Sequence, residues 1–165
     1  MKKQYLIIAI WILVGSIIAS EGWAQKSVSG EFNKLKKLEG DWKGLQPDGK
    51  RVEVNYKVMS NGSVVVETLM PENEPSMVTV YHMDGNKLMM THYCSAGNQP
   101  RMVAKAMESE IDFRFVDATN LENKSEGHMT GLKFIFIDDN HFNQVWTWSE
   151  NGKGKPGTFE FERAI

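Results

Sequence analysis

The chain has 165 residues, a formal net charge of -2 and 41% hydrophobic residues, which fits one domain with an apolar core. This near-neutral balance offers no basic patch to nucleic acid, so we expect no nucleic-acid partner. A single cysteine excludes an internal disulfide framework and a cysteine-rich zinc site.

The first 24 residues have the three-part pattern of a secretory signal peptide. Two lysines precede an uncharged 15-residue run, Tyr5–Ala19, and the small residues Gly22 and Ala24 mark a cleavage site after Ala24. The alternative is an uncleaved anchor, but the run is shorter than the roughly 20 residues that span a bilayer. We therefore expect a mature domain of residues 25–165, periplasmic or secreted from a bacterium, with no stable membrane span after cleavage.

After the leader, one short helix and then only β-strands are predicted. Apolar residues recur at helical spacing between a suitable N-cap, Ser29, and a glycine stop, Gly40, which predicts a helix over Ser29–Leu38. From there, period-2 alternation bounded by Gly, Asn, Asp and Pro indicates about ten strands. These strands span Trp42–Gln46, Arg51–Val58, Ser63–Met70, Met77–Met83, Lys87–Cys94, Gln99–Glu108, Ile111–Val116, His128–Ile137, Phe142–Trp148 and Thr158–Arg163.

The connections between consecutive strands are mostly short turns, such as Asn61-Gly62 and Asp84-Gly85-Asn86. Such turns favour an antiparallel up-and-down meander. Closing the meander into a barrel would remove its exposed edges. The predicted fold is therefore all-β, a roughly ten-stranded antiparallel up-and-down barrel preceded by a short N-terminal helix, with an open β-sandwich as the alternative.

Strand parity gathers aromatic side chains on what would be the inner wall of the barrel. Phe142, Trp146 and Trp148 share one face of their strand, and Phe134 and Phe136 share a face of the strand before it. These side chains either fill a core or line a cavity, because a ten-stranded barrel is wide enough to leave space. A small apolar or amphipathic molecule is the partner that such a cavity would take.

Polar residues concentrate in the central strands. His92 and Cys94 share one face of their strand, and if that face points inward, Arg101 from the next strand lies beside them. Glu67 is the carboxylate expected to pair with Arg101 or His92, because buried charges need partners. The candidate ligand-binding residues are Glu67, His92, Tyr93, Cys94, Arg101, Trp146 and Trp148.

This polar cluster is open to three interpretations. It is a satisfied structural network, a site that orients a ligand, or the pocket of an enzyme that uses His92 with Cys94 or Glu67 for acid–base chemistry. The sequence shows no oxyanion hole or orienting group for a cysteine nucleophile. The four scattered histidines have no zinc-ligand spacing, so no metal site is expected. A structural domain without any pocket is the remaining alternative.

The segment Leu38-Glu39-Gly40-Asp41-Trp42 places a Gly-x-Trp triplet between the predicted helix and the first strand, and Arg163 lies in the last strand. This pairing resembles the calycin group of β-barrels, which includes lipocalins, fatty-acid-binding-like barrels and nitrobindin-like haem barrels. The resemblance implies that Trp42 closes the barrel base and that Arg163 packs across it, in a cation–π contact worth roughly 0.5–2 kcal/mol. Both residues would be structural.

The run from Val80 to Arg101 is similar to exported bacterial proteins of unknown function. That likeness covers nearly the whole mature chain and implies no activity. Nitrobindin-like barrels hold haem through a histidine near the chain end, and the strand Thr158–Arg163 contains none. A haem role would therefore need His92 or His128, and the sequence names no cofactor.

Overall fold

The computed structural model describes residues 29–106 and 110–164. The expectations for the leader, and for the end of the strand predicted to reach Glu108, lie outside the described residues. A helix spans residues 29–36, and its apolar residues Phe32 and Leu35 are buried against the sheet. It ends before Gly40, whose φ of +117° suits glycine and starts the first strand.

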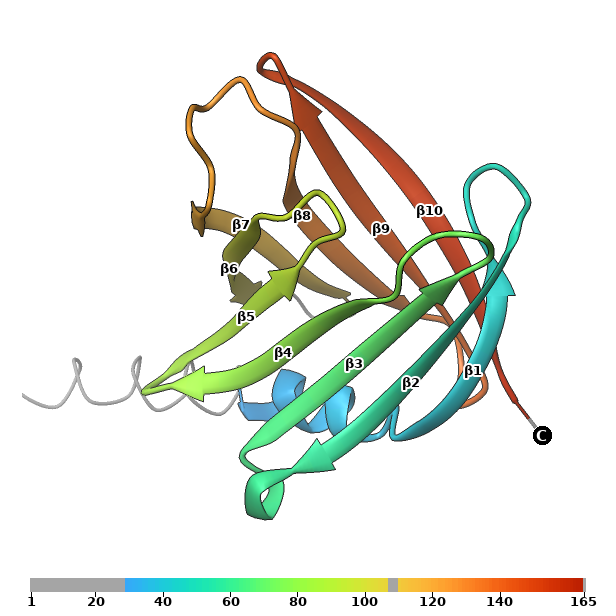
Figure 1. Cartoon of the computed structure of the whole chain (residues 1–165). Helices are drawn as coiled ribbons and strands as arrows, with labels where there is room; N and C mark the ends of the chain where they lie inside the picture. The colour runs from blue at the N-terminus through green and yellow to red at the C-terminus, as the bar shows by residue number, and fades with distance from the viewer. Residues whose placement is uncertain (1–28, 107–109, 165) are drawn as a thin grey trace, which may run out of the picture.

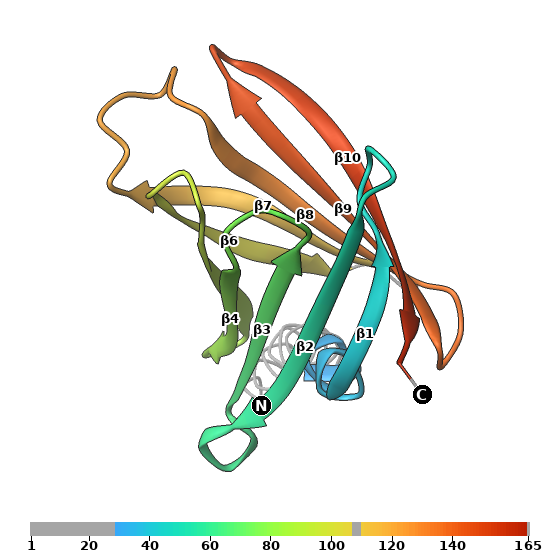
Figure 2. The ribbon, with the colours of Figure 1, turned by 45° about the vertical axis from the view of Figure 1, so that its right-hand side comes forward.

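Ten strands follow the helix and form one closed antiparallel barrel in which each strand pairs with its neighbours along the chain (Figure 1). The last strand returns to pair with the first (Figure 2). This result confirms the up-and-down barrel with a preceding helix and excludes the open sandwich. The strands are β1 Gly40–Leu45, β2 Arg51–Met59, β3 Val64–Pro71, β4 Met77–Asp84, β5 Lys87–Tyr93, β6 Gln99–Ala106, β7 Glu110–Thr119, β8 His128–Phe136, β9 His141–Glu150 and β10 Lys153–Arg163, and a short 3-10 helix, η1, spans Ser60–Gly62.

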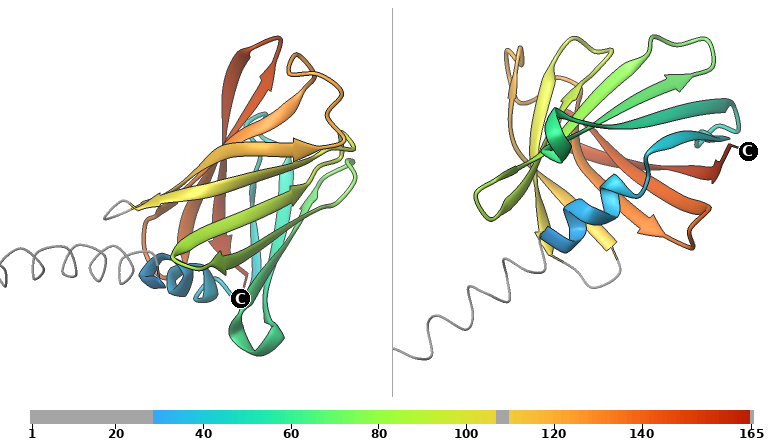
Figure 3. Two further views of the ribbon diagram at one scale, coloured as in Figure 1. Left: turned by 90° about the vertical axis from the view of Figure 1, so that its left-hand side faces the viewer. Right: turned by 90° about the horizontal axis from the view of Figure 1, so that it is seen from below.

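The meander gives the barrel two different ends. The helix lies across the end formed by the β2–β3, β4–β5 and β8–β9 connections, which we call the helix end (Figure 3). The β1–β2, β3–β4, β5–β6, β7–β8 and β9–β10 connections, of which the β7–β8 segment 120–127 is the longest, form the opposite end, which we call the loop end. Any residue near the C-terminal end of β5 or the start of β4 therefore lies toward the loop end.

Alternation along the strands separates the barrel interior from its surface. In β2, Val52, Val54 and Tyr56 are buried while Arg51 and Glu53 are exposed. The pairing shifts register between β6 and β7 next to Arg101, and between β8 and β9 next to Met129, as at a β-bulge. The alternation of inward and outward side chains is interrupted at each shift, so a residue beyond it need not face the side that counting along the strand would predict.

The helix end is closed by the predicted pair of Trp42 and Arg163, which lie opposite each other on β1 and β10. The Arg163 guanidinium carbon lies 4.2 Å from the centroid of the Trp42 ring. Arg163 also donates to the carbonyls of Lys37 and Glu39, each at 3.1 Å, and the Trp42 indole donates to Leu38 at 2.7 Å. The expected cation–π contact is therefore present, and it joins the first and last strands to the turn after the helix.

Candidate functional site

A carboxylate lies in the middle of the barrel. Glu67 of β3 is fully buried, and its Oε2 accepts hydrogen bonds from the hydroxyls of Tyr56 on β2 and Tyr81 on β4, at 2.8 and 2.7 Å. The Nε2 of Gln144 on β9 donates to the same oxygen at 2.8 Å. Aromatic rings surround these donors, with Phe142 at 6.0 Å from Tyr56. Three donors on one oxygen replace the water that a buried carboxylate loses.

The orientation of the Gln144 amide is fixed by its other partners. The indole Nε1 of Trp146 donates to Gln144 Oε1 at 2.9 Å, and an indole nitrogen can only donate. The Gln144 Nε2 therefore faces both Glu67 and the Tyr56 hydroxyl, the latter at 2.8 Å. Because Tyr56 accepts from Gln144, its own proton goes to Glu67.

Burial and hydrogen bonding oppose each other at this carboxylate. Burial raises the pKa of Glu67 above its ordinary value of 4.5, while the hydrogen bonds from Tyr81, Tyr56, Gln144 and Thr79 act to lower it. Burial, and then the nearby Glu67 charge, raise the pKa of both tyrosines well above 10. Both tyrosines therefore remain protonated donors across the physiological range.

Toward the loop end, Thr79 connects this carboxylate to an imidazole. The Thr79 hydroxyl lies 3.4 Å from Glu67 Oε1 and 2.9 Å from Nδ1 of His92 on β5. The His92 ring is buried and lies 4.6 Å from the Trp146 ring. Its Nε2 is buried and has no hydrogen-bond partner among the described residues. Burial lowers the pKa of His92 from 6.5 to about 4, so the ring is neutral at pH 7.

The inner wall becomes less buried between His92 and the loop end. Cys94, two residues after His92, is a free thiol of intermediate exposure that packs against the core. Trp148 and Phe159, on the inward faces of β9 and β10, are also only half-buried. A second buried polar atom without a partner, Oδ1 of Asn98, lies in the β5–β6 turn at the same end. Half-buried apolar side chains thus surround partnerless polar atoms at the loop end.

The structure brings together only some of the residues predicted for the site. Glu67, His92 and Trp146 belong to one buried network, and Cys94 and Trp148 share its inner wall toward the loop end. Thr79 separates Glu67 from His92, so the predicted carboxylate–imidazole pair is indirect. The role of these residues in binding a ligand stays a prediction.

Two of the predicted site residues, Tyr93 and Arg101, lie on the outside of the barrel, and for Arg101 this contradicts the expected place beside His92 and Cys94. Tyr93 is 51% exposed, because the inward residues of β5 are Leu88, Met90 and His92. Arg101 lies between two buried residues, faces outward, and donates from Nε to Asp117 at 2.6 Å. Its guanidinium lowers the pKa of Asp117. The carboxylate partner of Arg101 is therefore Asp117 on the surface, and not Glu67 in the core.

Sequence reasoning missed four members of the network, namely Tyr56, Thr79, Tyr81 and Gln144. Strand parity carried a usable signal for Gln144, which lies between the inward residues Phe142 and Trp146. A polar residue at an inward position of an otherwise apolar face predicts a buried partner. The partner itself is on another strand 77 residues away, so local sequence cannot name it.

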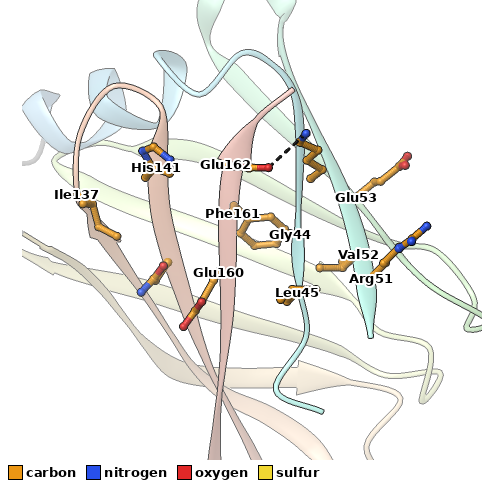
Figure 4. A pocket seen from close by; sticks show the side chains of 12 residues that line it. Gly44, Leu45, Arg51, Val52, Glu53, Ile137, His141, Glu160, Phe161 and Glu162 are labelled. Atoms are coloured by element: carbon orange, nitrogen blue, oxygen red, sulfur yellow. Dashed lines mark ion pairs between the residues drawn. The ribbon is translucent and has the colours of Figure 1, made fainter. Parts of the chain in front are cut away.

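A large cavity lies elsewhere, on the outside of the barrel. It is a groove of about 820 Å³ over β9, β10, β1 and β2 (Figure 4). None of the residues predicted for the site lines it. Its walls combine exposed apolar and charged side chains, among them Lys43, Leu45, Arg51, Glu53, Ile137, His141, Glu160 and Glu162.

Two kinds of feature are absent from residues 29–106 and 110–164. In these ranges no group of three or more His, Cys, Asp or Glu side chains is placed to hold a metal ion. Within the same ranges, no helix has the length and apolar character needed to cross a membrane.

The fold and the buried polar network define the chain as a closed ten-stranded barrel of a kind found among bacterial proteins of unknown function. Neither a family model nor a curated protein matches the sequence. The solved structure of Rv2717c from M. tuberculosis is similar, with a TM-score of 0.53 and 14% identity over 81% of this chain and 96% of that one.

A second similar structure is a protein of unknown function of the DUF3598 family from Nostoc punctiforme. Its TM-score is 0.52 and its identity 10%, over 79% of this chain and 49% of that one. This chain therefore spans about half of that relative. At such identities the two likenesses concern the fold alone.

Proposed function

We propose that the protein is an exported, calycin-like barrel that binds a small apolar or amphipathic molecule inside its loop end. The observation that carries this proposal is the buried Nε2 of His92, which finds no hydrogen-bond partner in residues 29–106 and 110–164 and lies within a half-buried apolar wall. A buried polar atom without a hydrogen bond costs about 1–3 kcal/mol. A ligand that supplies the missing bond would recover that cost.

The surrounding side chains fit such a ligand. Trp148 and Phe159 are half-buried on the inner wall, and Trp146 lies against the His92 ring. Aromatic walls supply affinity through buried apolar area, and one placed polar atom supplies orientation. The contact of Trp42 with Arg163 supports the calycin likeness.

The first experiment is native mass spectrometry of protein purified from its own host, which would detect a co-purified small molecule. The second titrates the fluorescent probe N-phenyl-1-naphthylamine. Cys94→Trp would place a bulky ring inside the loop end and should abolish the fluorescence gain. The matched control Leu45→Trp would fill the outer groove, since Leu45 lines it and is 49% exposed, and should leave the gain unchanged.

The outer groove is the second candidate site because its volume of about 820 Å³ is large enough for a small molecule. If Leu45→Trp abolishes probe binding and Cys94→Trp does not, the ligand occupies the groove and interior binding is refuted. The two variants therefore separate the two locations directly.

Export is part of the proposal and rests on the leader pattern alone. The intact mass of protein from the periplasm or medium of the host should correspond to residues 25–165. Recovery of uncleaved chain in the membrane fraction would contradict it.

A further inference from the structure

The network that leads from Glu67 to His92 also determines which kind of atom the loop end can bind. Thr79 has one hydroxyl proton, and two acceptors lie within reach of it, Glu67 Oε1 and His92 Nδ1. If Thr79 donates to Glu67, then His92 must donate from Nδ1, and its Nε2 is an acceptor. If Thr79 donates to His92, the proton of the imidazole lies on Nε2, which is then a donor.

The partners of Glu67 decide between these two arrangements. Oε2 takes the hydroxyls of Tyr56 and Tyr81 and the amide of Gln144, three donors at 2.7–2.8 Å, an arrangement suited to an anion. Among the described contacts, Oε1 has Thr79 as its donor. Withdrawing that proton toward His92 would leave a charged, buried oxygen without a hydrogen bond, at the usual cost of about 1–3 kcal/mol or more.

We propose that the Nε2 of His92 is a hydrogen-bond acceptor set by Glu67 through Thr79, and that the ligand inside the barrel presents an O–H or N–H to it. This inference rests on the proposed function for the ligand, but the tautomer of His92 is a property of the protein alone. The expected ligand class is a neutral apolar molecule with one donor, such as an alcohol, a phenol or an N–H heterocycle.

Glu67→Gln supplies a test, because it should reverse the direction of the hydrogen bonds through Thr79 while keeping every group in place. The amide oxygen replaces Oε2 and keeps the donors from Tyr56, Tyr81 and Gln144. The amide nitrogen replaces Oε1 and donates to Thr79, whose hydroxyl is left with His92 Nδ1 as its acceptor. The Nε2 of His92 then carries the proton and becomes a donor.

The tautomer is read by ¹⁵N NMR at pH 7, with the His92 signals assigned by their loss in His92→Asn. The wild type should show a protonated Nδ1 and a bare Nε2, and Glu67→Gln should show the reverse. Glu53→Gln, at an exposed glutamate on β2, is the matched control and should keep the wild-type pattern. A protonated Nε2 in the wild type overturns the inference. Thr79→Val provides a second variant, in which the influence of residue 67 on the tautomer should disappear.

The ligand class is tested by calorimetry with two probes of similar size. The indole N–H can only donate, whereas the quinoline nitrogen can only accept. The wild type should bind indole about tenfold more tightly than quinoline, and Glu67→Gln should reverse this order. The matched probe forms a hydrogen bond with the Nε2 of His92, whereas the mismatched probe leaves this nitrogen buried without one. Tighter binding of quinoline by the wild type overturns the inference and leaves interior binding intact. If neither probe shifts the NMR signals of His92 and Trp146 at millimolar concentration, interior binding itself fails, and the ligand class fails with it.

Discussion

At the scale of single residues, the partners of Glu67 explain how a carboxylate persists inside an aromatic barrel. A charged group in low dielectric normally shifts its pKa or finds compensation, and here two hydroxyls and an amide converge on one oxygen. Each donor comes from a different strand, so each is held by the barrel and not by a flexible loop. Removing one of these donors should therefore be costly.

Tyr81→Phe removes one donor and leaves the ring in place. We expect a loss of about 1–3 kcal/mol in the free energy of unfolding, because the Glu67 oxygen loses a buried hydrogen bond. Urea titration followed by tryptophan fluorescence measures this loss. Tyr93→Phe is the matched control, since Tyr93 is 51% exposed, and an equal loss in both variants would contradict the explanation.

The free energy of unfolding should depend on pH through the protonation of His92. The folded pKa is lowered from 6.5 to about 4, so the unfolded chain binds the proton more readily between these values. The free energy of unfolding therefore has its full value above pH 6.5 and falls by roughly 3 kcal/mol as the pH drops toward 4, because protonation then favours the unfolded chain. Glu67 acts in the opposite direction, because its folded pKa is raised and folding then favours its protonated form.

His92→Asn should flatten this loss when unfolding free energies are compared at pH 7 and pH 4.5. The control is His141→Gln at an exposed position, which should retain the wild-type difference. An unchanged pH profile in His92→Asn would show that His92 is not the group that titrates on unfolding.

The residue scale also shows how far the sequence predicts the candidate site. Glu67 and His92 were predictable because each is a polar residue within a largely apolar strand, and a buried polar group needs a partner. Arg101 was predicted to point inward, although the sequence held a signal against it. Lys105 lies on the same face of the strand, and two cations on one face indicate that the face is exposed to solvent. The hydrogen-bond partners could not be predicted, because they depend on strands distant in sequence.

At the scale of elements, the seam between β1 and β10 is the short junction at which the barrel closes. Four residue pairs join these strands, against ten between β10 and β9. Gly44 lies in this seam, and a Cβ there would be 2.0 Å from the carbonyl oxygen of Glu160. The two backbones approach so closely only because the side chain is absent.

Gly44→Ala should separate β1 from β10 and lower the free energy of unfolding by about 1–3 kcal/mol, the usual range for overpacking. Gly30→Ala is the control, because Gly30 lies in the helix and a Cβ there would meet nothing within 4 Å. It should be neutral or stabilising by roughly 0.5–1 kcal/mol. Equal destabilisation by both alanines would contradict the role of the seam.

At the scale of the whole molecule, Arg163 joins the last strand of the barrel to the first. It contacts Trp42 on the first strand and two carbonyls in the turn after the helix. Arg163→Met keeps the aliphatic bulk but loses the cation and its donors, so we expect a loss of about 1–3 kcal/mol. Urea unfolding measures it, with the exposed Arg51→Met as control. Matching losses in the two variants would argue against a special closing role.

The whole fold was predictable because its signals are local. Ten alternating segments separated by short turns leave few topologies, and closure removes the edges. The outer groove was not predictable, because its walls come from β1 and β2 at one end of the chain and from β9 and β10 at the other. The curvature that brings these faces together has no local sequence signal.

The polar network also has a consequence for how the barrel folds correctly. A slip of β3 by one residue would bring Val66 inside and send Glu67 into solvent. Tyr56, Tyr81 and Gln144 would then be buried with no carboxylate to receive their protons, and each orphaned group costs about 1–3 kcal/mol. With an apolar residue at position 67, β3 would carry apolar side chains on both faces, and its pairing register would be less strongly specified. The buried carboxylate therefore makes the native register of β3 lower in free energy than a slipped one.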